Sequence, residues 1–358
     1  MSTSAVINPE RLESVVGDLG SHAAAAAGLA MFELGDRLGL YRALAGAGPT
    51  TASDLAGRTG CEQRLVAEWL FSQAAAGYLQ YDESSDTFEL GLEESVVLAD
   101  DDSPAFFGGV AQIIRSFFLD GDRLAAAFKG DGGLAWDQHH ECLYSGTDRF
   151  FGHTYRHFLV PEWIPKIDGL VDALTDGGRV LEVGCGSGIA LVEMAIAFPE
   201  ASFVGVDSHP RAIERAQDRA ATAGVGNRVS FKVGYADQIA PSGCFDAVFF
   251  IEALHDMGDP DAAIRQAGSN LAEDGVVVAI EINAGDTRSE QIADPMAPLQ
   301  FAASTALCTP GALAQRGPRA LGNQVGVARW REIFAENGFS TLENLDRTPN
   351  MMVLAARR

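Results

Sequence analysis

The segment at residues 180–188 constrains the fold most, because an apolar run ends there at an acidic residue and three glycines follow at alternate positions. Glycine adopts positive φ and lets a backbone approach a ligand closely. A helix that begins near Ile189 would point its N-terminus at that ligand. A second apolar run, residues 203–206, ends at Asp207, whose carboxylate can accept hydrogen bonds from both hydroxyls of a ribose. The two strand ends predict a nucleoside-binding site.

The spacing of the glycines separates two classes of cofactor. A dinucleotide fingerprint has its last glycine, or an alanine, at the position of Ile189, whereas the third glycine here comes one place earlier, at Gly188. An NAD-dependent oxidoreductase is therefore disfavoured. The acidic-x-Gly-x-Gly-x-Gly pattern instead resembles motif I of class I S-adenosylmethionine (SAM) methyltransferases. The resemblance implies that Glu182 lies near the amino group of SAM and that Asp207 holds its ribose.

The resemblance continues downstream of the glycines. Residues 234–237 resemble the adenine-binding loop of the family, and residues 245–250 resemble the strand that leads to its reaction centre. The family commonly has an aspartate directly after Gly234, where this chain has Tyr235, so we expect Asp237 to contact the adenine and Tyr235 to stack on it. The cofactor-binding residues implied are Glu182, Gly184, Cys185, Gly186, Gly188, Asp207, Ser208, Tyr235, Ala236, Asp237 and Ile251. The cofactor would be SAM, with S-adenosylhomocysteine as its product.

The reaction chemistry is expected just after that strand, at residues 252–260. Their Leu-His-Asp run resembles the same run in O-methyltransferases, which implies that His255 is a general base that takes the proton of an attacking hydroxyl. Glu281 matches the acidic residue that orients this histidine in the family, and Glu252 or Asp256 is an alternative. Two other functions stay open: N- or C-methylation by proximity alone, and SAM binding by a regulator without catalysis.

A winged-helix domain is predicted for residues 1–99. The expected elements are helices at residues 24–38, 52–59 and 62–76, followed by a hairpin of residues 78–81 and 87–90. Thr51 and Asp54 are spaced as a capping box at the start of the second helix. Residues 24–44 carry more apolar surface than such a small domain buries, which favours a homodimer.

The charge of this segment argues against nucleic-acid binding. Residues 50–98 contain two basic and nine acidic side chains, and the whole chain has a formal net charge of −23. Binding to nucleic acid depends on neutralising phosphates, so a duplex would be repelled. A winged helix ahead of a class I core resembles the dimerising methyltransferases of bacterial secondary metabolism and plant phenol O-methylation. There the winged helix forms the dimer interface and one wall of the substrate site.

Residues 100–176 predict a helical linker on the substrate side, and residues 177–358 predict a Rossmann-like core of seven strands. Eleven aromatic residues fall between residues 106 and 158, and we expect most to pack in the core and some to line the acceptor pocket. The predicted strands are residues 179–183, 203–207, 229–233, 245–251, 276–282, 340–345 and 350–355. Residues 283–319 are long for a connection, so residues 298–310 are interpreted as a substrate-side helix and lid.

The composition indicates a reduced, cytoplasmic protein without a metal. The five cysteines are scattered and show no C-x-x-C spacing. Histidines at positions 139, 140, 153 and 157 lack a further ligand at a metal-motif spacing, so no metal site is expected. The N-terminus lacks a basic region followed by an apolar stretch, and the alanine-rich residues 23–30 are too short to cross a bilayer.

Overall fold

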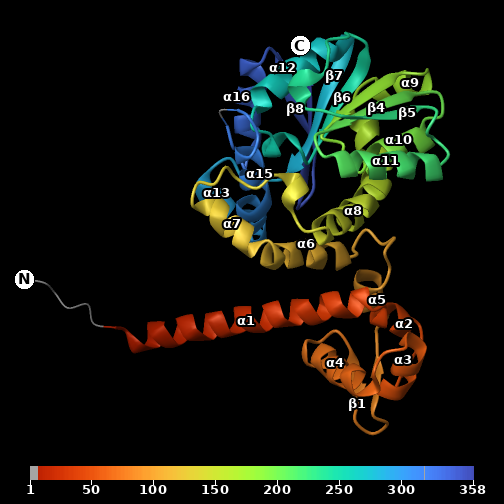
Figure 1. Cartoon of the computed structure of the whole chain (residues 1–358), viewed down its shortest axis with the longest axis vertical. Helices are drawn as coiled ribbons and strands as arrows, with labels where there is room; N and C mark the ends of the chain where they lie inside the picture. Colours follow the sequence, from red (N-terminus) through yellow and green to blue (C-terminus); the bar gives the residue numbers. More distant parts are fainter. Residues whose placement is uncertain (1–6, 318) are drawn as a thin grey trace, which may run out of the picture. The chain divides into compact units, whose positions relative to one another are not determined.

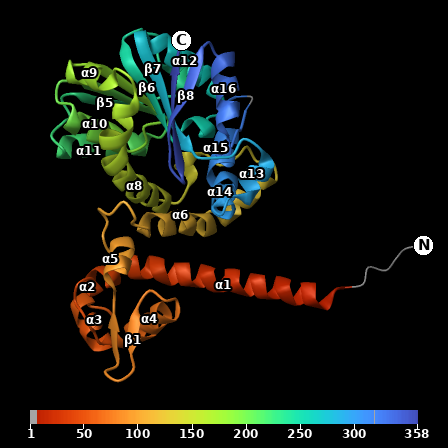
Figure 2. The same cartoon turned by 180° about the vertical axis from the view of Figure 1, so that it is seen from behind.

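The computed structural model describes residues 7–317 and 319–358, with the side chain of Asp237 not described. The chain divides into two compact units (Figures 1 and 2). One comprises the residues up to Arg115 together with Cys142–His153, and the other comprises Ser116–Glu141 and Thr154–Arg358. The predicted linker, residues 100–176, is thus divided between both units.

The first unit has the predicted order of helices and hairpin. Its elements are α1 (Pro9–Arg37), α2 (Leu40–Leu44), α3 (Ala52–Thr59), α4 (Gln63–Ala75), β1 (Gln80–Asp82), β2 (Thr87–Glu89) and α5 (Leu92–Leu98). The capping box of Thr51 and Asp54 is present at the start of α3. Tyr41, Trp69 and Phe88 are buried in the core of the unit. Helices α6 (Gly108–Leu119) and α8 (Cys142–Thr154) each run across a boundary between the units.

Helix α1 is longer than predicted, because it begins at Pro9 behind an Asn8 cap rather than near residue 24. Residues 9–27 are exposed, so the extra turns contribute no core to the unit. Among the described residues, α1 is also long and apolar enough to span a membrane by length and composition. The sequence-based expectation considered only residues 23–30 and missed this, since the apolar stretch begins earlier.

The second unit contains the predicted seven-stranded sheet, in the order β5-β4-β3-β6-β7-β9-β8. Its strands are β3 (Arg179–Val183), β4 (Ser202–Asp207), β5 (Val229–Val233), β6 (Phe245–Ile251), β7 (Leu271–Ile282), β8 (Thr341–Arg347) and β9 (Met351–Arg357). The first five are parallel, and β9 pairs antiparallel with both β7 and β8. The Rossmann-like class is confirmed, and only the start of β7 and the last two strands differ noticeably from prediction.

Helices cover both faces of this sheet. Helices α9 (Leu170–Thr175), α10 (Ile189–Ala197) and α11 (Pro210–Thr222) lie on one side, and α12 (Pro260–Asn270) and α16 (Val327–Glu336) lie on the other (Figures 1 and 2). On the α12 side, Leu181, Phe250 and Trp330 belong to one buried cluster. The other elements are α7 (Gly121–Phe128), η1 (Trp136–Gln138), η2 (Tyr155–Trp163), η3 (Ile164–Lys166), η4 (Ala236–Gln238) and η5 (Leu254–Asp256).

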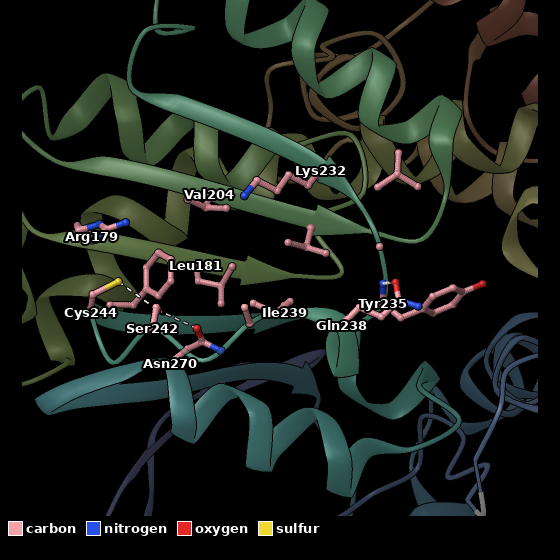
Figure 3. A pocket seen from close by; sticks show the side chains of 15 residues that line it. Arg179, Leu181, Val204, Lys232, Tyr235, Gln238, Ile239, Ser242, Cys244 and Asn270 are labelled. Atoms are coloured by element: carbon pink, nitrogen blue, oxygen red, sulfur yellow. Dashed lines mark hydrogen bonds between the residues drawn. The ribbon is translucent and has the colours of Figure 1, made fainter.

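The connection between β5 and β6 contains only the single turn η4, so no α-helix covers the sheet there. A cavity of about 470 Å³ opens beside this connection, with Leu181, Val204 and Lys232 on its sheet side and Tyr235 at one end (Figure 3). Its lining includes none of Glu182, Asp207 or His255, the predicted chemical groups.

The long connection after β7 is mainly helical, as predicted for residues 298–310. It contains α13 (Arg288–Ala293), α14 (Ala297–Ala303), the π-helix η6 (Ser304–Cys308) and α15 (Thr309–Leu313). Its role as a lid stays a prediction.

Candidate functional site

The glycine-rich loop connects β3 to α10, and its three glycines have positive φ: 79° at Gly184, 51° at Gly186 and 70° at Gly188. A Cβ on Gly184 would lie 2.5 Å from Ala253, and one on Gly188 would lie 2.6 Å from the Phe231 ring. These two glycines allow close packing. A Cβ on Gly186 would meet nothing within 4 Å, so the loop presents open space there.

Asp207 at the end of β4 is tied to the glycine loop. Its Oδ2 accepts the Gly186 N–H at 2.8 Å, and its Oδ1 accepts the His209 N–H at 2.8 Å. Each oxygen keeps a further lone pair, which is what bidentate binding of a diol requires. Burial raises the pKa of Asp207, and the two backbone donors oppose that rise.

Glu182 at the end of β3 is 3% exposed, and its Oε2 has no hydrogen-bond partner in the described part of the chain. Burial, and then the charge of Asp207, raise the pKa of Glu182 well above its usual value. A buried carboxyl without a partner calls for a ligand that donates hydrogen bonds. Cys185 beside it is also buried, and burial raises the pKa of its thiol.

The predicted adenine loop is joined to the same strand end, because the Gly234 N–H donates to the Asp207 backbone carbonyl at 2.9 Å. Tyr235 is 49% exposed and its ring is free to receive a planar group. Ala236 begins the turn η4. The side chain of Asp237 lies outside the described residues. The two remaining predicted contacts differ in burial: Ser208 is exposed and Ile251 is buried.

The end of β6 is strained at Glu252, a non-glycine residue with a φ of 51°. Its N–H donates to the Ile280 carbonyl at 2.8 Å, and its Oε1 is buried without a hydrogen-bond partner. Such strain concentrates at functional sites. Glu252 lies close enough to His255 for their charges to interact, although no hydrogen bond joins them in the described structure.

His255 lies on η5, just after β6, and is 3% exposed. Its Nδ1 bonds Glu281 Oε2, and Glu281 Oε1 accepts the Leu254 N–H at 3.1 Å. The predicted pairing of His255 with Glu281 is thus present, while Glu252 does not take that place. Burial by itself lowers the pKa of His255, but the charges of Glu281 and Asp256 outweigh it and hold the pKa well above its usual value.

Asp256 and Cys308 surround the other nitrogen of His255. Asp256 Oδ1 lies 3.1 Å from His255 Nε2, but this contact does not have the geometry of a hydrogen bond. Asp256 Oδ1 therefore has no hydrogen-bond partner among the described residues. Cys308, at the end of η6, is buried next to both residues, and burial raises the pKa of its thiol to about 12. The sequence analysis placed Cys308 in the predicted substrate-side segment, residues 298–310, but did not predict its contact with His255, which lies fifty-odd residues earlier in the chain.

A second carboxylate–histidine pair was also missed by the sequence analysis. Asp120 Oδ2 lies 2.9 Å from His139 Nδ1, and both side chains are 1% exposed. His139 Nε2 is buried and has no hydrogen-bond partner in the described chain. Asp256 is close enough for its charge to act on the pKa of His139, although burial leaves that pKa below its usual value.

The predicted groups come together along one edge of the sheet. Asp207 ends β4, Glu182 lies at the end of β3, His255 follows β6, and Glu281 lies at the end of β7. These four parallel strands are neighbours in the sheet. In open α/β sheets, ligands bind outside the carboxyl ends of the strands, at the point where the strand order reverses.

Comparisons with known proteins define the class of both parts of the chain. Residues 174–338 match the family described as a methyltransferase domain, and residues 25–100 match an Rv2258c-like winged HTH domain. The chain therefore carries a methyltransferase domain behind a winged helix–turn–helix domain.

Particular proteins similar to this chain carry related names. The 27-O-demethylrifamycin SV methyltransferase of Amycolatopsis mediterranei is 33% identical over 141 residues, which are 36% of this chain and 51% of that protein. The chain spans about half the length, or less, of the curated relatives it matches.

Two solved structures share the fold over nearly the whole chain. An O-methyltransferase family protein from Burkholderia thailandensis has a TM-score of 0.70 at 14% identity, covering 99% of each chain. The O-methyltransferase from neocarzinostatin biosynthesis, solved with SAM and 2-hydroxy-5-methyl naphthoic acid, has a TM-score of 0.62 at 18% identity, covering 93% of this chain and 96% of that one.

Proposed function

We propose that this chain transfers the methyl group of SAM to a hydroxyl oxygen of a small aromatic molecule. The observation that best supports this function is the shared strand edge described above. It places a diol-binding carboxylate, an unpartnered buried carboxyl and a carboxylate–histidine pair next to a methyltransferase glycine loop. A dinucleotide dehydrogenase is disfavoured by Ile189, which stands where its fingerprint has a glycine or an alanine.

The residues at β3 and β4 fit SAM. Asp207 has spare lone pairs for the ribose hydroxyls, Glu182 Oε2 lacks a donor that an ammonium group would supply, and the space at Gly186 admits a ligand. We propose the remaining predicted contacts, from Ser208 to Ile251, as the rest of this site. When bound, SAM supplies an electrophilic methyl group on a sulfonium.

The residues at β6 and β7 activate the acceptor. Glu281 accepts the hydrogen of His255 Nδ1, which fixes the tautomer in which Nε2 carries the lone pair of the neutral ring. The raised pKa of His255 makes the neutral imidazole a stronger base, and the neutral form is reached only above that pKa. In that form Nε2 takes the proton of the acceptor hydroxyl, and Asp256 beside it stabilises the imidazolium that forms. Burial of the three side chains excludes water from the reaction.

The class of acceptor is inferred from likeness. The neighbour from neocarzinostatin biosynthesis holds a hydroxylated naphthoic acid, and the rifamycin relative is named for an O-methyl group. We propose that this chain likewise acts on a hydroxylated aromatic compound of secondary metabolism, in the cytoplasm.

Cofactor binding tests the function directly. Calorimetry with the purified chain should show binding of SAM or S-adenosylhomocysteine at micromolar level, and no binding of NAD. Asp207→Ala should weaken SAM binding, because it removes the acceptor of the ribose hydroxyls. The matched control is Asp218→Ala, which removes an exposed aspartate of α11, the helix that follows Asp207 in the chain. Equal SAM affinity in wild type and Asp207→Ala would show that Asp207 does not bind the ribose of SAM.

We also propose that the chain is a homodimer held by its N-terminal helices and that its winged helix does not bind DNA. Leu12, Val16 and Leu19 are 52%, 61% and 62% exposed on α1. They recur at helical spacing on one face, as in helices that pack against a partner. A second copy of α1 offers the same face, which satisfies the self-complementarity of a two-fold interface.

A further inference from the structure

Three buried side chains at the edge of the sheet gather potential metal ligands. His255 Nε2, a carboxylate oxygen of Asp256 and Cys308 Sγ all lie within 4.8 Å of one another. Imidazole and thiolate prefer zinc and related transition ions, whereas magnesium and calcium prefer sites made of oxygen alone. The donor set therefore matches a zinc-type ion.

The surroundings of these ligands have the features of a metal site. A histidine that binds a metal nearly always donates its other ring N–H to a carboxylate, and His255 Nδ1 bonds Glu281. Asp256 is 7% exposed, and its Oδ1 has no hydrogen-bond partner in the described chain. This oxygen lies 3.1 Å from His255 Nε2, so an ion bound between the two atoms would replace that contact with two metal–ligand bonds.

The third ligand lies at the end of a π-helical turn. Cys308 ends the π-helix η6, and short π-helical turns occur frequently at functional sites. The helix that follows, α15, is fixed to the same loop, because Gln315 Nε2 donates to the Asp256 carbonyl at 2.8 Å. The residues that follow Cys308 are therefore tied to the loop that carries Asp256.

We propose that His255, Asp256 and Cys308 form a binding site for one divalent transition-metal ion such as Zn²⁺. Bond lengths of about 2.0–2.3 Å require these ligand atoms to close toward one another by about 1 Å or less. A thiolate and a carboxylate together neutralise the charge of the ion, which a buried site demands. Three protein ligands leave a fourth position open.

Metal binding and the proposed base role exclude each other, because His255 Nε2 cannot hold an ion and accept a proton at once. Zinc should therefore inhibit methyl transfer, a consequence that rests on the proposed function. The binding site itself does not rest on it, and binding is measured without any acceptor.

The test uses the full chain after removal of metals with a chelator. Titration with Zn²⁺ by calorimetry should give one ion per chain, while Mg²⁺ should give no heat of binding. Co²⁺ added in its place should produce the near-ultraviolet charge-transfer band of a thiolate ligand and the visible bands of a tetrahedral site. Glu281→Gln should weaken zinc binding by roughly 10–100-fold, the usual effect of removing the partner of a ligating histidine.

Cysteine variants separate this site from adventitious binding. Cys308→Ser should abolish the cobalt charge-transfer band, whereas Cys244→Ser, at a cysteine outside the cluster, should leave it unchanged. Circular dichroism confirms that each variant is folded, and Glu281→Gln provides the test if Cys308→Ser does not fold. The proposal is overturned if wild type lacks the band or binds no zinc, or if Cys308→Ser behaves as wild type. If the wild type binds SAM but no zinc, the metal site is wrong and the proposed function is unaffected.

Discussion

At the scale of single residues, the functional site is defined by buried polar groups rather than by exposed ones. Glu182, Glu252, Asp256 and His139 each contain a buried polar atom without a hydrogen-bond partner in the described structure. Such groups destabilise a fold by about 1–3 kcal/mol each when nothing compensates them. Their concentration at one edge of the sheet indicates that ligands complete the site.

The first prediction at this scale concerns the general base. His255→Ala should lower turnover by roughly two to four orders of magnitude, the usual size of general-base assistance, with SAM affinity nearly unchanged. Glu281→Gln should lower turnover by a comparable factor, because an amide that donates to Nδ1 favours the tautomer in which Nε2 carries the proton and cannot accept another. Both are measured with any acceptor that wild type methylates. Most of the activity surviving in His255→Ala would contradict the base mechanism and favour an amine or a carbon nucleophile.

A second residue-scale prediction concerns His139, whose pKa burial lowers from its usual 6.5 despite the opposing effect of Asp120. The unfolded chain takes up a proton below about pH 6.5 that the folded chain takes up only at lower pH, so the free energy of unfolding falls as pH drops through this range. The loss is at most about 1.4 kcal/mol per pH unit.

The matched variant is His139→Asn, since an asparagine amide can still donate to Asp120 but does not titrate. Urea unfolding at a series of pH values should show a steeper loss of stability toward acid in wild type than in the variant. Parallel curves for the two proteins would show that His139 is not held neutral.

At the scale of elements, one arginine of the segment Cys142–His153 pairs with a buried carboxylate of helix α1. Arg149 Nη1 and Nη2 lie 2.6 and 2.9 Å from the carboxylate of Asp36, whose side chain is 1% exposed. Arg149→Met should destabilise this unit by about 3 kcal/mol or more, because it leaves a buried charge without its main partner.

Arg42 provides the control, since it contacts the same Asp36 carboxylate at 3.4 Å with 45% of its side chain exposed. Arg42→Met should cost less than about 1 kcal/mol, as is usual for exposed pairs. Thermal or urea unfolding monitored by circular dichroism measures both. Equal losses of stability in the two variants would show that Arg149 is not the main partner of Asp36.

The elements also show how far the sequence alone predicts this protein. Strands β3, β5 and β6 match their predicted bounds: β3 and β6 are mainly apolar runs typical of buried parallel strands, and the edge strand β5 alternates apolar and polar residues at its start. The pairing of His255 with Glu281 was expected because both residues carry a family motif. The contact of Cys308 with His255 and the pair of Asp120 with His139 were not expected, since tertiary packing alone produces them, and neither has a local signature.

At the scale of the whole molecule, the chain combines a methyltransferase domain with a winged-helix domain. Within the first unit, residues 9–27 of the long helix α1 are exposed. The sequence predicted excess apolar surface at residues 24–44. In the structure, most of the exposed large apolar side chains of α1 lie before residue 24. A protein rarely leaves such a stripe in water unless it binds a partner or a membrane.

The last prediction therefore concerns assembly. Light scattering of the full chain at tens of micromolar should give twice the mass of one chain, since C2 dimers are the commonest assembly of such patches. The double variant Val16→Glu with Leu19→Glu should be monomeric, because it places charges in the centre of the exposed stripe. Ile196→Glu is the control, at a 56% exposed apolar residue of α10 in the other unit, and should leave the mass unchanged. A monomeric wild type that instead binds lipid vesicles through α1 would replace the dimer with a membrane-associated protein.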